Sequence, residues 1–290
     1  MPYLERPGAN LFFDVVGEGP STLITTHGLT QCGAYWSRTG VSHALAEAGF
    51  RVVDLDLRGH GRSTPLFDED PGYTVDQIAN DLGALADHLG ADQFHLLNHA
   101  TGGMAGLRFA MEHHERLLSL VSTDTGSATA PSDKFSDPNY EGPYPAPFAT
   151  PFDNPAVTEL EAFSVREIIQ RARQGDGRPF QLGFATNEDP ERCWHWLEDI
   201  RANGHPSHMA EFGRTFFNDL DPKIAGLKKI ACPNFVLIGE LDVMFRKPAE
   251  LLAQHLPQVE YQVVPGRGHM LAIEDPRGTA ETLLTFFRRL

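Results

Sequence analysis

The chain has 290 residues, of which 41% are hydrophobic and 22% charged, and its formal net charge is −15. This length allows one large α/β domain or two small ones, and the composition excludes both a mini-protein and a disordered chain. The negative charge repels phosphate backbones and anionic bilayers, so we expect neither a nucleic-acid nor a membrane partner.

The cysteines Cys32, Cys193 and Cys232 are odd in number and widely spaced, with no CxxC pair. This pattern favours a reducing compartment and predicts neither a disulfide framework nor a metal site. The amino terminus lacks a basic segment followed by an apolar run, and no stretch approaches the ~18 apolar residues that a membrane span needs. We therefore expect a soluble, cytoplasmic protein.

Short apolar runs alternate with segments of helical period over the first part of the chain. The runs predict strands at 10–16, 21–26, 51–57, 93–98 and 117–123, and the intervening segments predict helices at 35–48, 75–89 and 101–113. This alternation is typical of an α/β fold whose mostly parallel sheet is doubly wound, with helices on both faces.

The alternation stops near residue 126, and a run of prolines that no regular helix or strand accommodates follows: Pro131, Pro138, Pro143, Pro145, Pro147, Pro151 and Pro155. Helical periodicity then predicts helices at 164–174, 190–203 and 207–218. Strands at 234–239 and 260–265 and helices at 248–255 and 276–289 complete the pattern. We interpret 1–125 and 221–290 as one core domain and 126–220 as a helical insert.

The strand predicted at 93–98 leads directly into the run Asn-His-Ala-Thr-Gly-Gly at 98–103, after which a helix follows. Small residues are needed around the centre of such a sharp strand-to-helix turn, because its backbone is strained and crowded. The motif resembles the nucleophile elbow of the α/β-hydrolase superfamily, Gly-His-Ser-x-Gly-Gly. The resemblance covers the whole chain and implies the α/β-hydrolase fold, with the insert as its lid or cap.

Two residues depart from that motif. Ala100 stands where the nucleophile is expected, and a methyl group can neither attack a carbonyl nor be activated by a base. We therefore expect no covalent acyl transfer from this chain as written. Asn98 replaces the first glycine of the motif and is bulkier, so its amide could make a local hydrogen bond.

The resemblance also implies the acid and the base of a catalytic triad. Asp242 follows the strand at 234–239, and His269 follows the strand at 260–265, in the chain order that this fold uses. The acid orients the imidazole, which takes the proton of the nucleophile and returns it to the leaving group. Asp124, after the strand at 117–123, is the alternative acid.

The run Thr26-His27-Gly28-Leu29 resembles the His-Gly oxyanion loop of the family. Two backbone N–H groups would stabilise the charge on a tetrahedral intermediate, and the resemblance places them at Leu29 and Thr101. No proline follows in the form His-Gly-x-Pro, which argues against epoxide hydrolases and haloalkane dehalogenases. No cofactor and no metal are implied.

The insert carries an aromatic stretch that includes Trp194 and Trp196. These side chains are candidates for roofing a pocket that holds an apolar acyl or alcohol group. The alternative is that they pack the insert on itself.

Ala100 has two possible explanations, an engineered Ser→Ala change or a natural pseudoenzyme, and the retained Asp242 and His269 favour the first. The main hypothesis is a cofactor-free serine hydrolase whose partner is a small-molecule carboxylic ester or lactone. The alternatives are a ligand-binding pseudoenzyme, and a lyase or cofactor-free oxygenase in which His269 takes a substrate proton. The sequence predicts no oligomeric state and does not distinguish esters from lactones.

Overall fold

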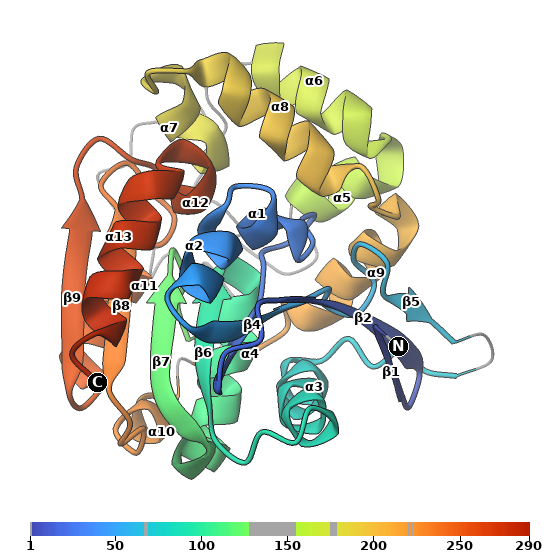
Figure 1. The fold of residues 1–290 in the computed structure, drawn as a ribbon. Helices are drawn as coiled ribbons and strands as arrows, with labels where there is room; N and C mark the ends of the chain where they lie inside the picture. The colour runs from blue at the N-terminus through green and yellow to red at the C-terminus, as the bar shows by residue number, and fades with distance from the viewer. Residues whose placement is uncertain (1, 67–68, 128–154, 175–178, 220, 222) are drawn as a thin grey trace.

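The computed structural model describes residues 2–66, 69–127, 155–174, 179–219, 221 and 223–290 (Figure 1). Within them, nine strands form one sheet in the order β1-β2-β4-β3-β6-β7-β8-β9, and β5 pairs with β2. The strand bounds are β1 Tyr3–Arg6, β2 Ala9–Val16, β3 Ser21–Thr25, β4 Phe50–Leu55, β5 Thr64–Pro65, β6 Phe94–His99, β7 Leu117–Thr123, β8 Asn234–Gly239 and β9 Val259–Val264.

All neighbouring strands from β4 through β3, β6, β7 and β8 to β9 are parallel, whereas the pairs made by β2 are antiparallel. Every residue of β6 and β8 is buried, as expected for central strands covered on both faces. The sequence-based prediction of an α/β fold with a mostly parallel sheet is confirmed.

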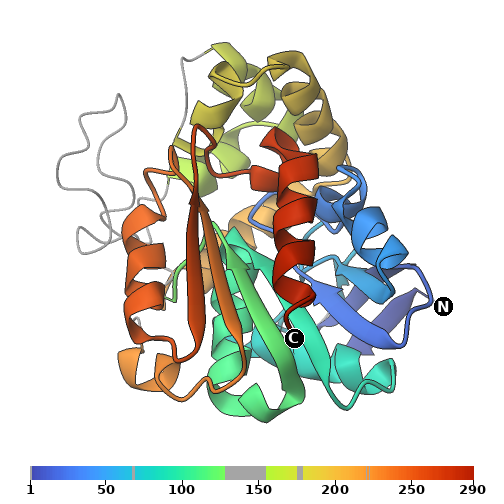
Figure 2. The same cartoon turned by 60° about the vertical axis from the view of Figure 1, so that its left-hand side comes forward.

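Helices cover both faces of this sheet (Figures 1 and 2). Their bounds are α1 Ala34–Ser37, α2 Val41–Glu47, α3 Val75–His88, α4 Ala100–His113, α5 Pro155–Ala162, α6 Val165–Gln174, α7 Leu182–Ala185, α8 Pro190–Arg201, α9 Pro206–Phe216, α10 Ile224–Leu227, α11 Arg246–His255, α12 Leu271–Glu274 and α13 Pro276–Phe287.

Successive strand residues alternate between two hydrophobic cores, one on each face. Leu96 and Val236 pack in the core formed with α3, α4 and α11, whereas Leu97 and Leu237 pack in the core formed with α1, α2 and α13. This alternation follows from the two-residue period of a strand. Both faces of the sheet are therefore covered by helices. The loops at the carboxyl ends of its strands are the places where side chains can meet a substrate.

Three sequence-based expectations need correction. The helix predicted at 35–48 is two helices, because Gly40 between them has a φ of +85° that ends α1 and starts α2. We expected no helix or strand to include any of the prolines in the run, but the last of them, Pro155, begins α5. Proline suits the first turn of a helix, where its missing N–H has no intrahelical partner. The short elements β1, β5, α7, α10 and α12 were not predicted.

Helices α5 to α9 lie between β7 and β8 along the chain, and Figure 1 shows α6 and α8 above the carboxyl ends of the strands. They have a small core of their own, which includes Leu160, Ile168 and Met209. The run of prolines up to Pro151 lies outside the described residues.

Candidate functional site

The turn from β6 into α4 is sharp and crowded. Ala100 has a φ of +48°, a left-handed conformation that costs a non-glycine residue roughly 1–2 kcal/mol. A Cβ on Gly102 would lie 2.2 Å from Thr26 Oγ1, and one on Gly103 would lie 2.5 Å from Thr125 Cγ2. The two glycines are therefore required by the close approach of their neighbours, and the strained centre of the turn carries only a methyl group.

Asn98, the other departure from the expected motif, connects neighbouring strands. Its Oδ1 accepts a hydrogen bond from Thr26 Oγ1 (2.9 Å), and its Nδ2 donates to the carbonyl oxygen of Val121 (3.4 Å). Because all three residues are fully buried or nearly so, these bonds satisfy polar groups that would otherwise be costly. The bulkier residue thus stabilises the sheet beneath the turn.

His269 and Asp242 form a buried hydrogen-bonded pair. His269 Nδ1 lies 2.8 Å from Asp242 Oδ2, while Asp242 Oδ1 accepts the backbone N–H groups of Met244 and Phe245, each at 3.1 Å. The carboxylate is therefore fixed on one side and orients the imidazole with the other. With the proton on Nδ1, the second ring nitrogen Nε2 makes no hydrogen bond to any residue of the described part of the chain, and it is available as a base.

Asp124, the alternative acid, faces a different histidine. Its Oδ1 accepts the N–H of Gly239 (3.0 Å), and its Oδ2 lies 3.7 Å from His99 Nδ1. Burial raises the pKa of Asp124 well above its usual value, and the neighbouring charge of Asp242 raises it further. The structure therefore pairs His269 with Asp242 and leaves Asp124 behind the site.

His99 connects the turn to the candidate base. His99 is the residue immediately before Ala100. Its ring stacks on the ring of Tyr35, with 4.3 Å between the centroids, and its centroid lies 4.9 Å from that of the His269 ring. Burial lowers the pKa of His99 well below its usual value, and the charge of nearby His269 adds to the effect, so its imidazole is neutral. The sequence analysis did not identify the contact between His99 and His269, although His99 belongs to the motif at 98–103.

The predicted oxyanion loop lies against the turn. A Cβ on Gly28 would be 3.0 Å from the Cβ of Ala100, so the loop backbone passes directly beside that methyl group. However, the N–H of Leu29 donates to Thr101 Oγ1 at 3.0 Å. A substrate oxygen that binds this N–H must first displace the Thr101 hydroxyl.

Two aromatic rings that carry no sequence signal enclose His269. Phe180 lies 4.8 Å from the imidazole, and Phe245 stacks on it at 5.2 Å with an angle of 22° between the planes. Phe180 belongs to the segment between β7 and β8, and Phe245 follows Asp242 closely. An isolated phenylalanine cannot be distinguished from a core residue in sequence, which is why both were missed.

The two tryptophans have other contacts in the structure. Trp194 packs edge-on against Phe184 at 5.0 Å, and the ring of Trp196 lies under the guanidinium groups of Arg38 (5.9 Å) and Arg192 (5.0 Å). Trp194 packs within the insert, as the packing alternative expected, but both rings also pack against the core that contains Trp36 and Leu271. Because no described contact joins either ring to His269, their role in substrate binding stays a prediction.

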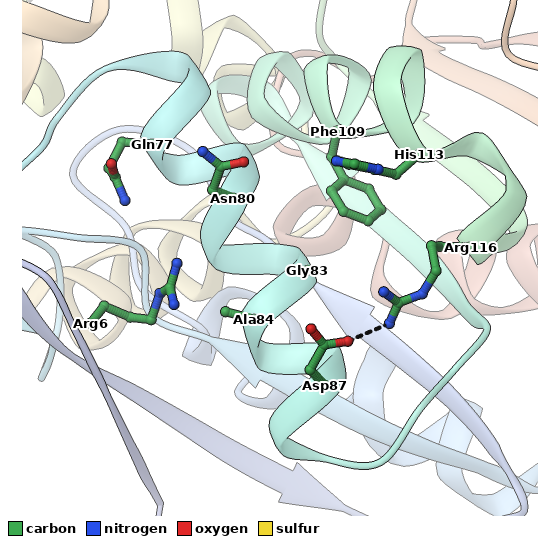
Figure 3. Close-up of a pocket in the computed structure, with 9 residues that line it drawn as sticks. All are labelled: Arg6, Gln77, Asn80, Gly83, Ala84, Asp87, Phe109, His113 and Arg116. Atoms are coloured by element: carbon green, nitrogen blue, oxygen red, sulfur yellow. Dashed lines mark hydrogen bonds and ion pairs between the residues drawn. The ribbon is translucent and has the colours of Figure 1, made fainter.

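A groove of about 530 Å³ lies elsewhere on the molecule, between α3 and the second half of α4 (Figure 3). Ala100 begins α4, which spans ~20 Å along its axis, so this groove is remote from the turn. Figure 3 shows Arg116 in the groove paired with Asp87, at 2.7 Å. The groove therefore forms no part of the candidate site.

The described residues show neither a cluster of metal-ligating side chains nor a membrane-spanning helix. They contain no group of three or more His, Cys, Asp and Glu side chains placed to hold a metal ion. None of their helices has the length and apolar character that a bilayer crossing requires.

The chain is similar in sequence and in structure to known proteins. A model of the alpha/beta hydrolase fold family matches residues 21–276. The chain is 38% identical over 287 residues to the "Putative carbamate hydrolase RutD" of Caulobacter sp. (strain K31), covering 95% of both chains. It is 28% identical to the non-heme chloroperoxidase CPO-A1 of Kitasatospora aureofaciens, covering 92% of this chain and 91% of that protein. Among solved structures it resembles MenH from S. aureus, with a TM-score of 0.78, 19% identity and 96% and 98% of the two chains covered.

Proposed function

The chain belongs to the alpha/beta hydrolase fold family, and from that premise we propose that it is the nucleophile-deleted form of a serine hydrolase of carboxylic esters or lactones. The observation that carries this proposal is the buried His269–Asp242 pair beside a strained turn. A φ of +48° at Ala100 is unfavourable for alanine, whose methyl group has no chemical use for the strained position. A nucleophile, by contrast, needs such a turn to be exposed to both base and substrate.

Each residue then has a chemical role in the Ala100→Ser protein. His269 Nε2 takes the hydroxyl proton while the oxygen attacks the carbonyl carbon, and the N–H groups of Leu29 and Thr101 stabilise the oxyanion. The intermediate collapses to an acyl-enzyme and expels the alcohol, which receives the proton from His269. Water, activated by the same imidazole, hydrolyses the acyl-enzyme. Asp242 orients the imidazole throughout.

We further propose that the helical segment within 126–220 is a cap over this site. Its support is Phe180, which belongs to that segment and lies 4.8 Å from the His269 ring. A substrate whose carbonyl reaches His269 must therefore pass its variable group beneath this segment. The cap then sets the size and polarity of the acyl or alcohol group.

The substrates for an activity test are chosen from the chemistry of the proposed reaction and from the name of a relative. Esters and lactones present a carbonyl with an oxygen leaving group that needs one proton from His269. The 38% identical relative is named as a carbamate hydrolase, and a carbamate carbonyl requires the same attack and the same oxyanion contacts. Carbamates therefore join esters and lactones of graded acyl length in the panel.

The test is the Ala100→Ser protein on this panel. We expect hydrolysis to rise by several orders of magnitude over the Ala100 chain, because loss of a catalytic serine costs on the order of 10⁶ in turnover. Adding His269→Ala to Ala100→Ser is the matched control and should abolish the gain. Equal turnover by the Ala100 and Ala100→Ser proteins would support instead a lyase or oxygenase in which His269 takes a substrate proton. Binding without turnover by both would support a pseudoenzyme.

A further inference from the structure

A buried carboxylate holds the backbone on both sides of His269. Glu274 Oε2 accepts the N–H of Gly268 at 2.5 Å, and Oε1 accepts the N–H of Met270 at 3.1 Å. Glu274 itself is 1% exposed. One side chain thus fixes the two peptide groups that flank the imidazole, so the direction of the ring depends on where this carboxylate sits.

The segment between β7 and β8 packs directly on that carboxylate. A Cβ on Gly183 would lie 1.9 Å from Glu274 Oε2, so only glycine fits there. The carbonyl oxygen of Glu274 also accepts a hydrogen bond from Asn187 Nδ2 at 2.7 Å. Glu274 therefore connects α7 and the start of α8 to the loop of His269.

The carboxylate is held by the backbone and not by a cation. Burial raises the pKa of Glu274, and the hydrogen bonds from Gly268 and Met270 act in the opposite direction. In the part of the chain that the structure describes, Arg267 pairs instead with Glu188 and Asp275, both at 3.9 Å. The hydrogen bonds that its two oxygens accept are therefore the described contacts that tie Glu274 to the loop of His269.

We propose that Glu274 is a positioning residue for His269, kept in place by the absence of a side chain at Gly183. Its carboxylate sets the loop so that Nδ1 meets Asp242 and the imidazole lies against His99, the residue before Ala100. This inference rests on the proposed function, because it takes His269 as the base of the reaction. A residue that only stabilised the fold would leave the His269–Asp242 geometry unchanged once the protein had folded.

Two variants disturb this arrangement in different ways. Glu274→Gln replaces one acceptor oxygen by an NH₂ group that cannot accept an N–H. Gly183→Ala keeps Glu274 and every hydrogen-bonding group, but its methyl would lie 1.9 Å from Glu274 Oε2 and 2.6 Å from the backbone nitrogen of Gly268, so the bond between these two groups must shift. The matched controls are Glu281→Gln, which removes an exposed carboxylate on α13, and Gly83→Ala on α3, where the added methyl would meet only a ring of Phe109 at 3.2 Å.

The first measurement needs no activity. In the Ala100 chain, proton NMR follows the hydrogen-bonded proton between His269 Nδ1 and Asp242. We expect its signal to be lost or broadened in Glu274→Gln and Gly183→Ala, and unchanged in both controls. The second measurement uses the Ala100→Ser background and the best ester of the panel. There we expect kcat to fall about 10- to 100-fold with KM within about twofold, because the base is misplaced while the binding surface persists.

The outcomes separate this inference from the proposed function. If the Ala100→Ser protein is inactive but the signal is lost only in the two variants, Glu274 positions His269 and the proposed function is wrong. If that protein is active and both variants match their controls in kcat and in signal, the inference about Glu274 is wrong. Should Glu274→Gln fail to fold, Gly183→Ala decides by the same criteria.

Discussion

At the scale of single residues, the site is defined by which hydrogen-bonding groups are already engaged. Asp242 uses both carboxylate oxygens, His269 keeps one nitrogen available, and the N–H of Leu29 is held by the Thr101 hydroxyl. The last bond competes directly with a substrate carbonyl. The Leu29 N–H, which we propose as an oxyanion donor, must therefore exchange the Thr101 hydroxyl for the substrate oxygen.

Thr101→Ala should consequently strengthen binding of an ester to the Ala100 chain. The variant removes the internal acceptor of the Leu29 N–H, so the ligand no longer displaces a hydrogen bond worth about 1 kcal/mol, and Kd should fall about fivefold. Isothermal titration calorimetry measures this directly. Thr101→Ser, which keeps the hydroxyl, is the control and should bind as the parent does. A Kd for Thr101→Ala equal to or higher than that of Thr101→Ser would contradict this account.

The two candidate acids should respond very differently to amidation in the Ala100→Ser background. Asp242→Asn loses the acceptor that fixes the His269 tautomer, and we expect kcat to fall by on the order of 10⁴. Asp124→Asn should stay within a few-fold of its parent. Asp124 lies beside His99 and not His269, so its amidation leaves the His269–Asp242 pair intact. Steady-state kinetics of both variants provide the test, and the reverse order of activities would make Asp124 the acid.

At the scale of elements, the turn between β6 and α4 depends on how closely the loop after β3 approaches it. A Cβ on Gly102 would lie 2.2 Å from Thr26 Oγ1 and 2.7 Å from the carbonyl oxygen of His27. The same approach brings the backbone of the oxyanion loop to the methyl of Ala100. One steric constraint thus shapes both the turn and the loop that faces it.

Gly102→Ala should therefore destabilise the fold by about 2 kcal/mol, because the added methyl overpacks a site with a backbone wall. Urea unfolding followed by circular dichroism measures the free energy of unfolding. Gly83→Ala is the comparison, since its methyl would contact only an adjustable aromatic ring and alanine favours a helix. Equal stability of the two variants would show that the turn has more space than the structure indicates.

The elements that sequence patterns predicted well are those buried on both faces. β7 and β8 have the predicted bounds, and β3 differs by one residue, because a long apolar run between turn signals has few alternative interpretations. Elements of about four residues, such as α12, are too short to show a period. Asp242 and His269 could be named from the family motif, and the structure places them 2.8 Å apart, whereas Glu274 and Phe180 reach His269 through tertiary contacts that no local pattern contains.

At the scale of the whole molecule, burial of titratable groups sets how stability depends on pH. Burial lowers the pKa of His95 on β6 from 6.5 to about 4, and its Nδ1 lies 2.8 Å from Ser119 Oγ. As pH falls below 6.5, the unfolded chain binds a proton at this residue before the folded chain does. The stability that neutral His95 contributes is therefore present above 6.5 and is lost as pH falls towards 4.

His95→Gln should remove this dependence. Between pH 7 and pH 4 we expect the parent to lose about 3 kcal/mol relative to the variant, because the pKa of His95 is 6.5 in the unfolded chain and about 4 in the fold. Denaturant unfolding of both proteins across this range is the measurement. Only their difference is informative, because burial raises the pKa of Asp54 to about 7 and that residue contributes with the opposite sign. A difference that does not change with pH would contradict a neutral, buried His95.

The most direct test of the central claim is covalent labelling at position 100. A fluorophosphonate reacts with a serine hydroxyl only when a neighbouring base and oxyanion donors activate it. Intact-protein and peptide mass spectrometry should find one adduct at position 100 in the Ala100→Ser protein. The adduct should be absent from the Ala100 chain and strongly reduced when His269→Ala is added. The serine-hydrolase account would be contradicted if the Ala100→Ser protein stayed unlabelled and the Ala100 chain turned over the ester at the same rate as the Ala100→Ser protein.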